Sequence, residues 1–342
     1  MQKEIIDLRS DTITRPTPAM LQAMMAAEVG DDVWGEDPTV KALEEATAKR
    51  FGMEAGLFCP SGTMTNQIAI KVLTQPGHEV ICAANAHIYV YEGGGIAFNS
   101  GCSVRLLPGD RGRLDPAAVV ANINPDDIHF PVTSLVALEN TMNKGGGSIY
   151  TLDQIAAIYK VCSERQIPLH LDGARVFNAL VETGEDSREY GRYFTTISVC
   201  LSKGLGAPVG SVLLGSREHI KKALRIRKAM GGGMRQAGYL AAAGLYALEH
   251  HVERLREDHV RARRLGETLA QLPWVAQVAP VDTNIVLFDL QGCSVPQVLE
   301  KLLQEGVKAA AFGPASIRMV THLEFTDEKL ERLLKILEQL RF

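Results

Sequence analysis

Short apolar, β-branched segments alternate with longer amphipathic ones through the first three-quarters of the chain. The candidate strands are GLFCPSG, EVICA, SVRLLPG, LVALEN, LHLDGA, TTISVCLS and GSVLLGS. Helical spacing of apolar residues separates several of them, as in LDQIAAIYKVCSERQ and from about Thr63 to Thr74. Because strands that alternate with helices form helix-covered parallel sheets, we expect a large α/β domain with a mostly parallel sheet.

Two of the expected helices carry recognisable ends. Asp37 and Pro38 have the residue types of a helix start, and Gly52 is placed to end that helix. Thr326 is placed to cap the C-terminal segment TDEKLERLLKILEQL.

The pattern changes at Met234, where a helical stretch interrupted only by glycines runs toward Leu272. Beyond it, NIVLFDL and SIRMVTH have the pattern of strands, and SVPQVLEKLLQEG has that of an amphipathic helix. A chain of 342 residues is too long for one ordinary core. We expect an N-terminal arm and large α/β domain over residues 1–250, and a small α+β domain over residues 251–342.

Composition narrows the class of partner. The net charge of −4 offers no basic surface to nucleic acid or an anionic membrane, which favours a small metabolite. The six cysteines have neither CxxC nor metal-ligand spacing, so we expect reduced thiols and no metal. No apolar run approaches the ~20 residues of a membrane span and the N-terminus has no signal-like segment, which predicts a cytoplasmic protein.

A single lysine, Lys203, stands between an apolar strand and several glycines in SVCLSKGLGAPVG. Lysine resists burial, so this position suggests either a surface side chain or a specific role. Gly204 and Gly206 resemble a dinucleotide-binding turn, but Val209 occupies the place of the third glycine. That fingerprint is therefore excluded.

Two other features accompany this lysine. Asp172 ends the strand-like LHLDGA, 203 − 172 = 31 residues before Lys203, and strand ends of a parallel sheet share one edge. The pair is either a structural ion pair or the binding set of pyridoxal phosphate, whose aldehyde needs a lysine and whose ring nitrogen needs a carboxylate. Ser61, Gly62 and Thr63 fall at a strand-to-helix turn, which either caps the helix or holds a phosphate.

Seven stretches carry a resemblance to a known family: DLRSDTITRPTPAM, VGDDVWGEDPTV, SGTMTNQ, IHFPVTSLVALENT, HLDGARVFNA, CLSKGLGAPVGS and GGGMRQAG. They resemble the low-specificity L-threonine aldolases, or L-allo-threonine aldolases, which are fold type I pyridoxal phosphate enzymes. The resemblance implies an aspartate aminotransferase-like fold with pyridoxal 5'-phosphate as cofactor. It also implies a homotetramer, a dimer of dimers with active sites shared between subunits.

The resemblance also implies roles for individual residues. Lys203 would form the Schiff base, Asp172 would pair with the ring nitrogen, and His87 would stack on the ring. The remaining cofactor-binding residues would be Ser61, Gly62, Thr63, Arg175 and Arg235, where Arg235 either comes from a neighbouring subunit or is an ordinary surface charge. Ser10, Arg175 and Arg318 would bind the substrate carboxylate, and Trp34 would line the substrate entrance.

Two positions depart from the family pattern. Trp34 replaces the usual tyrosine, which removes a hydroxyl but keeps an aromatic wall. Met142 replaces the usual histidine, and simple packing accounts for a methionine there. The range of substrates is therefore not given by the resemblance.

The activity implied is retro-aldol cleavage of L-threonine, L-allo-threonine and related β-hydroxy-α-amino acids to glycine and an aldehyde. A base must take the β-hydroxyl proton, and His87, His129 and a bound water are the candidates. Two alternatives stay open. One is β-elimination or transamination by the same cofactor, and the other is a non-catalytic cofactor-binding protein.

Overall fold

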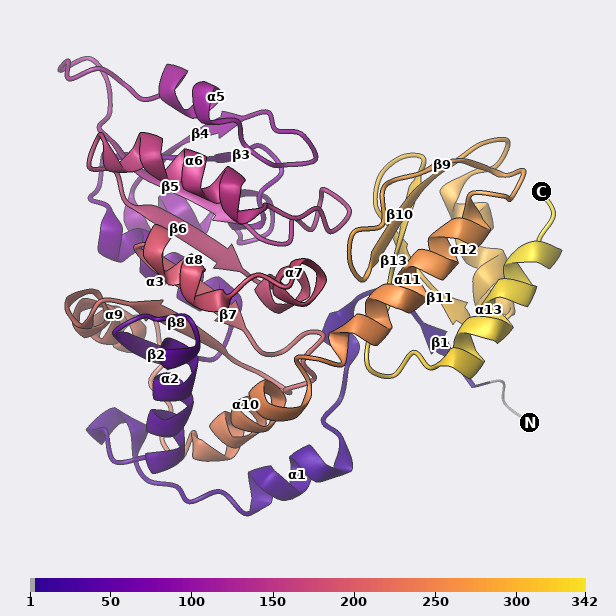
Figure 1. Ribbon diagram of the computed structural model, residues 1–342, viewed down its shortest axis with the longest axis horizontal. Coiled ribbons are helices and arrows are strands. Elements are labelled where there is room, and N and C mark those ends of the chain that lie inside the picture. The colour runs from indigo at the N-terminus through magenta and orange to yellow at the C-terminus, as the bar shows by residue number, and fades with distance from the viewer. Residues whose placement is uncertain (1–3) are drawn as a thin grey trace.

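The computed structural model describes residues 4–342, which form a larger and a smaller unit (Figure 1). The larger unit is built on a seven-stranded sheet of order β2-β8-β7-β6-β5-β3-β4. Only β8 runs against its neighbours, so the sheet is mostly parallel, as expected. The strands are β2 (Ala55–Cys59), β3 (Glu79–Ala83), β4 (Ser103–Leu107), β5 (Thr133–Glu139), β6 (Leu169–Gly173), β7 (Thr196–Cys200) and β8 (Ser211–Gly215).

Helices cover this sheet. Strands β3, β6, β7 and β8 are buried at every position, which is the consequence of packing on both faces. The helices of this unit are α1 (Pro18–Met25), α2 (Pro38–Arg50), α3 (Gly62–Leu73), α4 (His87–Val90), α5 (Pro116–Ala121), α6 (Leu152–Ser163), α7 (Val176–Thr183), α8 (Ser187–Tyr193), α9 (Arg217–Ala229) and α10 (Gly238–His250), together with a π-helical turn at Ile96–Ser100.

The expected helix ends are confirmed. Asp37 accepts a hydrogen bond from the N–H of Val40 at the start of α2, and Gly52 follows the helix with a φ of 66°. A positive φ suits glycine, which explains why the helix stops there. In the smaller unit, Thr326 accepts from the N–H of Lys329 as the cap of α13 (Asp327–Gln339).

A single helical stretch was expected from Met234 toward Leu272, and this prediction was wrong in one respect. The structure divides the stretch into two helices. Helix α10 ends at His250, and α11 (Leu255–Leu269) begins after a turn. At this turn Nδ1 of His251 lies 2.7 Å from the carbonyl oxygen of Leu205, in the loop that follows Lys203. This tertiary hydrogen bond ties the end of α10 to that loop, and α11 then enters the smaller unit (Figure 1).

The smaller unit holds a four-stranded antiparallel sheet of order β12-β13-β10-β9. Strand β1 (Ile6–Asp7) pairs in parallel with β11 (Val307–Lys308), so the first described residues pack with this unit before the chain crosses to the larger one. Its other elements are β9 (Val275–Val278), β10 (Ile285–Leu290), α12 (Val295–Gln304), β12 (Ala310–Ala311) and β13 (Ser316–Val320). No helix in residues 4–342 is long and apolar enough to cross a bilayer.

Candidate active site

Polar side chains meet at the carboxyl ends of neighbouring strands of the large sheet. Glu139 at the end of β5 lies in register with Asp172 on β6, and Lys203 follows β7. Oδ1 of Asp172 accepts the N–H of Ala174 at 3.1 Å, but Oδ2 is buried without a hydrogen-bond partner in the described chain. Leaving a buried polar atom unpaired costs free energy, so this oxygen is placed for a ligand donor such as a protonated ring nitrogen.

The backbone around Lys203 is held firmly. Its carbonyl oxygen accepts hydrogen bonds from Oγ1 of Thr14 at 2.8 Å and from the N–H of Gly206 at 2.9 Å. Gly206 has a φ of 78°, a conformation that side chains disfavour. Within residues 4–342 no hydrogen-bond partner of the Lys203 amine is found, so a fixed backbone presents an amine that is available for a ligand.

The N-terminus of α3 forms a cradle for an anion. Oγ of Ser61 accepts the N–H of Met64 at 3.2 Å, which caps the helix and leaves the N–H groups of Gly62 and Thr63 for a ligand. A Cβ on Gly62 would lie 3.4 Å from Oγ of Ser211, so the first turn of α3 packs closely on the sheet. The group fits the phosphate of the expected cofactor.

His87 begins α4 beside the unpartnered oxygen of Asp172. Its Nδ1 lies 4.0 Å from Oδ2 of Asp172 and 3.0 Å from Oε1 of Glu92, and its backbone N–H donates to Glu139 at 2.8 Å. Burial opposes the charged ring, but the hydrogen bond to Glu92 and the charges of Asp172 and Glu139 outweigh it and raise the pKa of His87. His87 is therefore held next to the position expected for the cofactor ring.

Glu139 was not among the site residues expected from the sequence. Burial, with the charge of Asp172 beside it, raises the pKa of the Glu139 carboxyl to about 7. A signal was present, because Glu139 ends LVALEN as Asp172 ends LHLDGA, and adjacent parallel strands align such ends.

Segments near the beginning and the end of the sequence meet at this site. Arg318 on β13 donates from Nη2 to the carbonyl of Arg9, the neighbour of Ser10, and from Nη1 to Oδ1 of Asn143 at 2.6 Å. Burial and the charge of Arg175 lower the pKa of Arg318 to about 10. The three residues predicted to bind the substrate carboxylate therefore lie in one region with excess positive charge. They are Ser10, Arg175 and Arg318.

Three predicted site residues do not join this group in the chain itself. His129 lies before the amino end of β5, opposite Glu139, with a side chain 79% exposed and Nδ1 bonded to Asp127 at 2.7 Å. It is therefore no base for the site of its own subunit, and that part of the expectation needs correction. Arg235 and Trp34 are exposed, and within the described residues neither forms a hydrogen bond with the cluster; Arg235 forms an ion pair with Asp31 at 2.8 Å.

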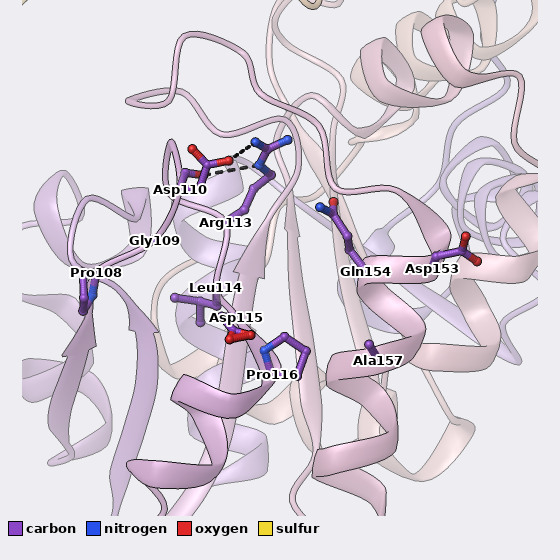
Figure 2. Close-up of a pocket in the computed structure, with 10 residues that line it drawn as sticks. All are labelled: Pro108, Gly109, Asp110, Arg113, Leu114, Asp115, Pro116, Asp153, Gln154 and Ala157. Atoms are coloured by element: carbon purple, nitrogen blue, oxygen red, sulfur yellow. Dashed lines mark hydrogen bonds and ion pairs between the residues drawn. The ribbon is translucent and has the colours of Figure 1, made fainter.

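A pocket of about 640 Å³ lies apart from these residues, between the loop after β4 and the start of α6 (Figure 2). Three of its four charged groups already have structural roles, since Asp110 pairs with Arg113 and Asp115 caps α5. None of the predicted site residues lines it. The strand-end cluster, and not this pocket, is the candidate active site.

Comparison with known proteins identifies the family of this chain. Residues 7–293 match the model of the family described as beta-eliminating lyase, and the chain belongs to that family. Within it, the chain groups with proteins named low-specificity L-threonine aldolase. The Escherichia coli (strain K12) protein is 44% identical over 95% of this chain and 96% of its own length, and the Arabidopsis thaliana protein is 41% identical over 98% and 96%.

Solved structures show the same fold. A Leishmania major threonine aldolase superposes with a TM-score of 0.86 at 21% identity, covering 98% of this chain and 99% of its own. A putative L-allo-threonine aldolase from Listeria monocytogenes superposes with a TM-score of 0.83 at 20% identity, covering 99% and 97%.

Proposed function

We propose that this protein is a pyridoxal phosphate-dependent aldehyde-lyase acting on β-hydroxy-α-amino acids. It cleaves L-threonine and L-allo-threonine to glycine and acetaldehyde, and related substrates to glycine and the matching aldehyde. The observation that carries the proposal is the buried, unpartnered Oδ2 of Asp172, at the sheet edge that also bears the Lys203 amine. The family membership and the relatives named above support the reaction type.

The residues fit the cofactor. Lys203 would hold its aldehyde carbon, Asp172 its ring nitrogen and His87 one face of its ring. The N–H groups of Gly62 and Thr63, behind the cap of Ser61, would bind its phosphate. When bound, the group supplies an electron sink for the pair left on Cα as the Cα–Cβ bond breaks.

The remaining groups orient the substrate and move a proton. Arg175 and Arg318, with the Ser10 hydroxyl, bind the substrate carboxylate and so hold the Cα–Cβ bond in one orientation. His87 takes the proton of the β-hydroxyl, whose oxygen becomes the carbonyl oxygen of the departing aldehyde. A proton returned to Cα completes glycine.

The proposal extends to a cytoplasmic homotetramer, a dimer of dimers with shared sites. Trp34 and Arg235 lie on an exposed surface of their own subunit, which suits residues that complete the site of a neighbour. Since His129 lies at the far end of β5 in its own chain, any part it has in proton transfer falls to the copy in a neighbouring subunit.

Product analysis tests the reaction. The purified protein with pyridoxal phosphate is incubated with L-threonine, L-allo-threonine and L-serine, and acetaldehyde, glycine and pyruvate are measured. Acetaldehyde and glycine in equal amounts are expected from the first two substrates. Pyruvate from L-serine, without acetaldehyde from the other two substrates, would instead establish β-elimination. A requirement for a 2-oxo acid would establish transamination.

Loss of the lysine tests the cofactor. Lys203→Ala should abolish turnover and shift the visible absorption band of the bound cofactor. The control Lys222→Ala removes an exposed lysine paired with Glu218 and should change neither. A holoprotein without activity on any amino acid would favour the non-catalytic alternative.

A further inference from the structure

We propose that Glu92 is a positioning residue that holds the ring of His87 in its Nδ1–H form, so that Nε2 is the atom that takes the β-hydroxyl proton. This inference deepens the proposed function and rests on it, because the function names His87 as the base. It assigns a task to a buried carboxylate that the sequence motifs left without one.

Glu92 is surrounded by donors. Its Oε1 accepts from Nδ2 of Asn66 at 2.9 Å and lies 3.0 Å from Nδ1 of His87, and its Oε2 accepts from Nε2 of Gln67 at 2.6 Å. The side chain of Glu92 is fully buried. Because a carboxylate can only accept, the hydrogen between Glu92 and His87 must reside on Nδ1. In the neutral ring, the lone pair is then on Nε2.

A second layer of buried side chains sets the orientation of Asn66. Its amide N–H donates to Glu92, so its Oδ1 must accept from Nε2 of His170, 3.1 Å away. Nδ1 of His170 in turn lies 2.9 Å from Oγ1 of Thr196, which donates to it. Burial lowers the pKa of His170 to about 4, so its ring is neutral with a single hydrogen. The direction of every hydrogen bond from Thr196 on β7 to His87 is therefore determined.

Glu92 lies in the turn after α4, where its carboxylate reaches Nδ1 of His87. Gly93 and Gly94 follow it with φ values of 61° and 73°, in the left-handed region that glycine tolerates. A Cβ on Gly95 would lie 2.6 Å from Cδ of Gln67, so a side chain at this position would displace the amide that donates to Glu92. The sequence EGGG thus encodes the close contact between Glu92 and its partners.

The other groups that face His87 come from three elements. Asp172 on β6 lies 4.0 Å from Nδ1, Glu139 on β5 accepts the backbone N–H, and the ring of Tyr91 lies 5.7 Å away. The carboxylates together outweigh burial and raise the pKa of His87. Because the neutral ring is the base, activity rises with pH through that pKa. Removing the charge of Glu92 therefore lowers the pKa and moves the acidic limb of the pH profile to lower pH.

The first experiment compares pH profiles of kcat/KM and kcat for L-allo-threonine, using holoenzyme. Glu92→Gln should move the acidic limb down by about one pH unit. It should also reduce the plateau of kcat roughly 10- to 100-fold, with little change in KM. Losses of this size are typical when a residue that orients a reacting group through a hydrogen bond is removed. Glu92→Asp keeps the charge but shortens the side chain, so it should lose rate while moving the limb less.

The matched control is Glu79→Gln. Glu79 is also a buried glutamate, held by Asn124 and Arg105, but it begins β3 at the opposite edge of the sheet. This variant should keep the wild-type profile. If Glu92 only satisfied buried amides, Glu92→Gln would keep the acidic limb of the wild type, and that result overturns the proposal.

The second measurement does not depend on turnover. Diethyl pyrocarbonate acylates unprotonated imidazole, so mass spectrometry of the peptide that contains His87 gives its reactivity in holoenzyme at each pH. The midpoint should fall in Glu92→Gln and stay constant in Glu79→Gln, whereas a constant midpoint in both overturns the coupling. A wild-type protein that releases no aldehyde would refute the proposed function, yet this midpoint would still decide the role of Glu92. If His87→Phe retains the acidic limb, the assignment of Nε2 fails while the aldolase function stands.

Discussion

Asp11 and Arg175 form a buried two-point ion pair although 164 residues separate them along the chain. Nε and Nη2 of Arg175 donate to the two carboxylate oxygens of Asp11 at 2.8 and 2.7 Å. Nδ2 of Asn284, from the smaller unit, donates to the same carboxylate at 3.2 Å. The pair therefore joins the N-terminal arm, the end of β6 and the smaller unit behind the proposed carboxylate site.

Asp11→Asn should destabilise the protein and weaken substrate binding. Breaking a buried pair leaves Arg175 uncompensated, at a cost of about 3–5 kcal/mol. Burial opposes the charge of Asp11, but Arg175 outweighs it and holds the pKa of that carboxyl below its usual range. The stabilisation is therefore present above the unfolded pKa and is lost as the pH falls.

Urea denaturation at pH 7 and at acidic pH measures this effect. The difference between wild type and Asp11→Asn should shrink as the solution becomes acidic. Glu218→Gln, in the exposed pair with Lys222, should unfold like the wild type at both pH values. An equal loss in the two variants would contradict the importance assigned to the buried pair.

Arg318→Lys should raise KM more than it lowers kcat. Lysine keeps the charge but lacks the planar guanidinium group. That group donates to Asn143 and to the carbonyl of Arg9, and in the proposed function it also binds the substrate carboxylate. Losing one or two charged hydrogen bonds corresponds to a KM increase of roughly 10- to 100-fold. Steady-state kinetics on L-threonine gives the effects on KM and kcat separately, and Arg105→Lys, on the edge strand β4, serves as the control. An unchanged KM would remove Arg318 from the carboxylate site.

Mixed oligomers should show whether Arg235 acts across a subunit boundary. Lys203→Ala and Arg235→Ala are each expected to be poorly active alone. If a site takes Lys203 from one chain and Arg235 from another, random mixing restores about a quarter of the sites. Half of the chains carry the native Lys203 and the other half the native Arg235, and each site draws its two chains independently. Activity is measured after co-expression with two affinity tags. Failure to exceed the sum of the separate variants would place both residues in the same chain.

The unfolding free energy should fall in mild acid because of His259. Its ring, on α11, lies 2.9 Å from Glu182 and 3.0 Å from Asn178, both on α7. Burial lowers the pKa of His259 to about 4, so the unfolded chain binds the proton first as the pH falls below ~6.5. Stability is then lost at up to about 1.4 kcal/mol per pH unit between these values.

Denaturation curves at pH 7 and pH 5 test this linkage. His259→Gln should show a smaller loss between the two pH values than the wild type. His250→Gln removes a half-exposed histidine at the end of α10. This variant should lose as much unfolding free energy between pH 7 and pH 5 as the wild type. Equal slopes for all three proteins would rule out His259 as the titrating group.

Local patterns in the sequence were sufficient for the seven strands of the large sheet, for β10 and β13, for the helix caps and for the positions of Asp172 and Lys203 at strand ends, but they did not predict β1, β9, β11 or β12. Each depends on a short stretch of chain: apolar runs form buried strands, and the ends of parallel strands lie at one edge. The division between α10 and α11 was not predicted, since the turn between them carries a tertiary hydrogen bond from His251 to a distant loop that no local pattern shows.

The tertiary structure alone decided which distant residues meet. Arg318 and Arg9 are 309 residues apart, and Asn66 and Gln67 of α3 hold the carboxylate of Glu92 about 25 residues further along the chain. It also removed His129 from the site of its own chain. Such contacts depend on how the smaller unit, the N-terminal arm and the sheet pack together, and no local pattern of apolar and polar residues specifies that packing. The sequence by itself determined the chemical groups available, whereas packing decided which of them act on one another.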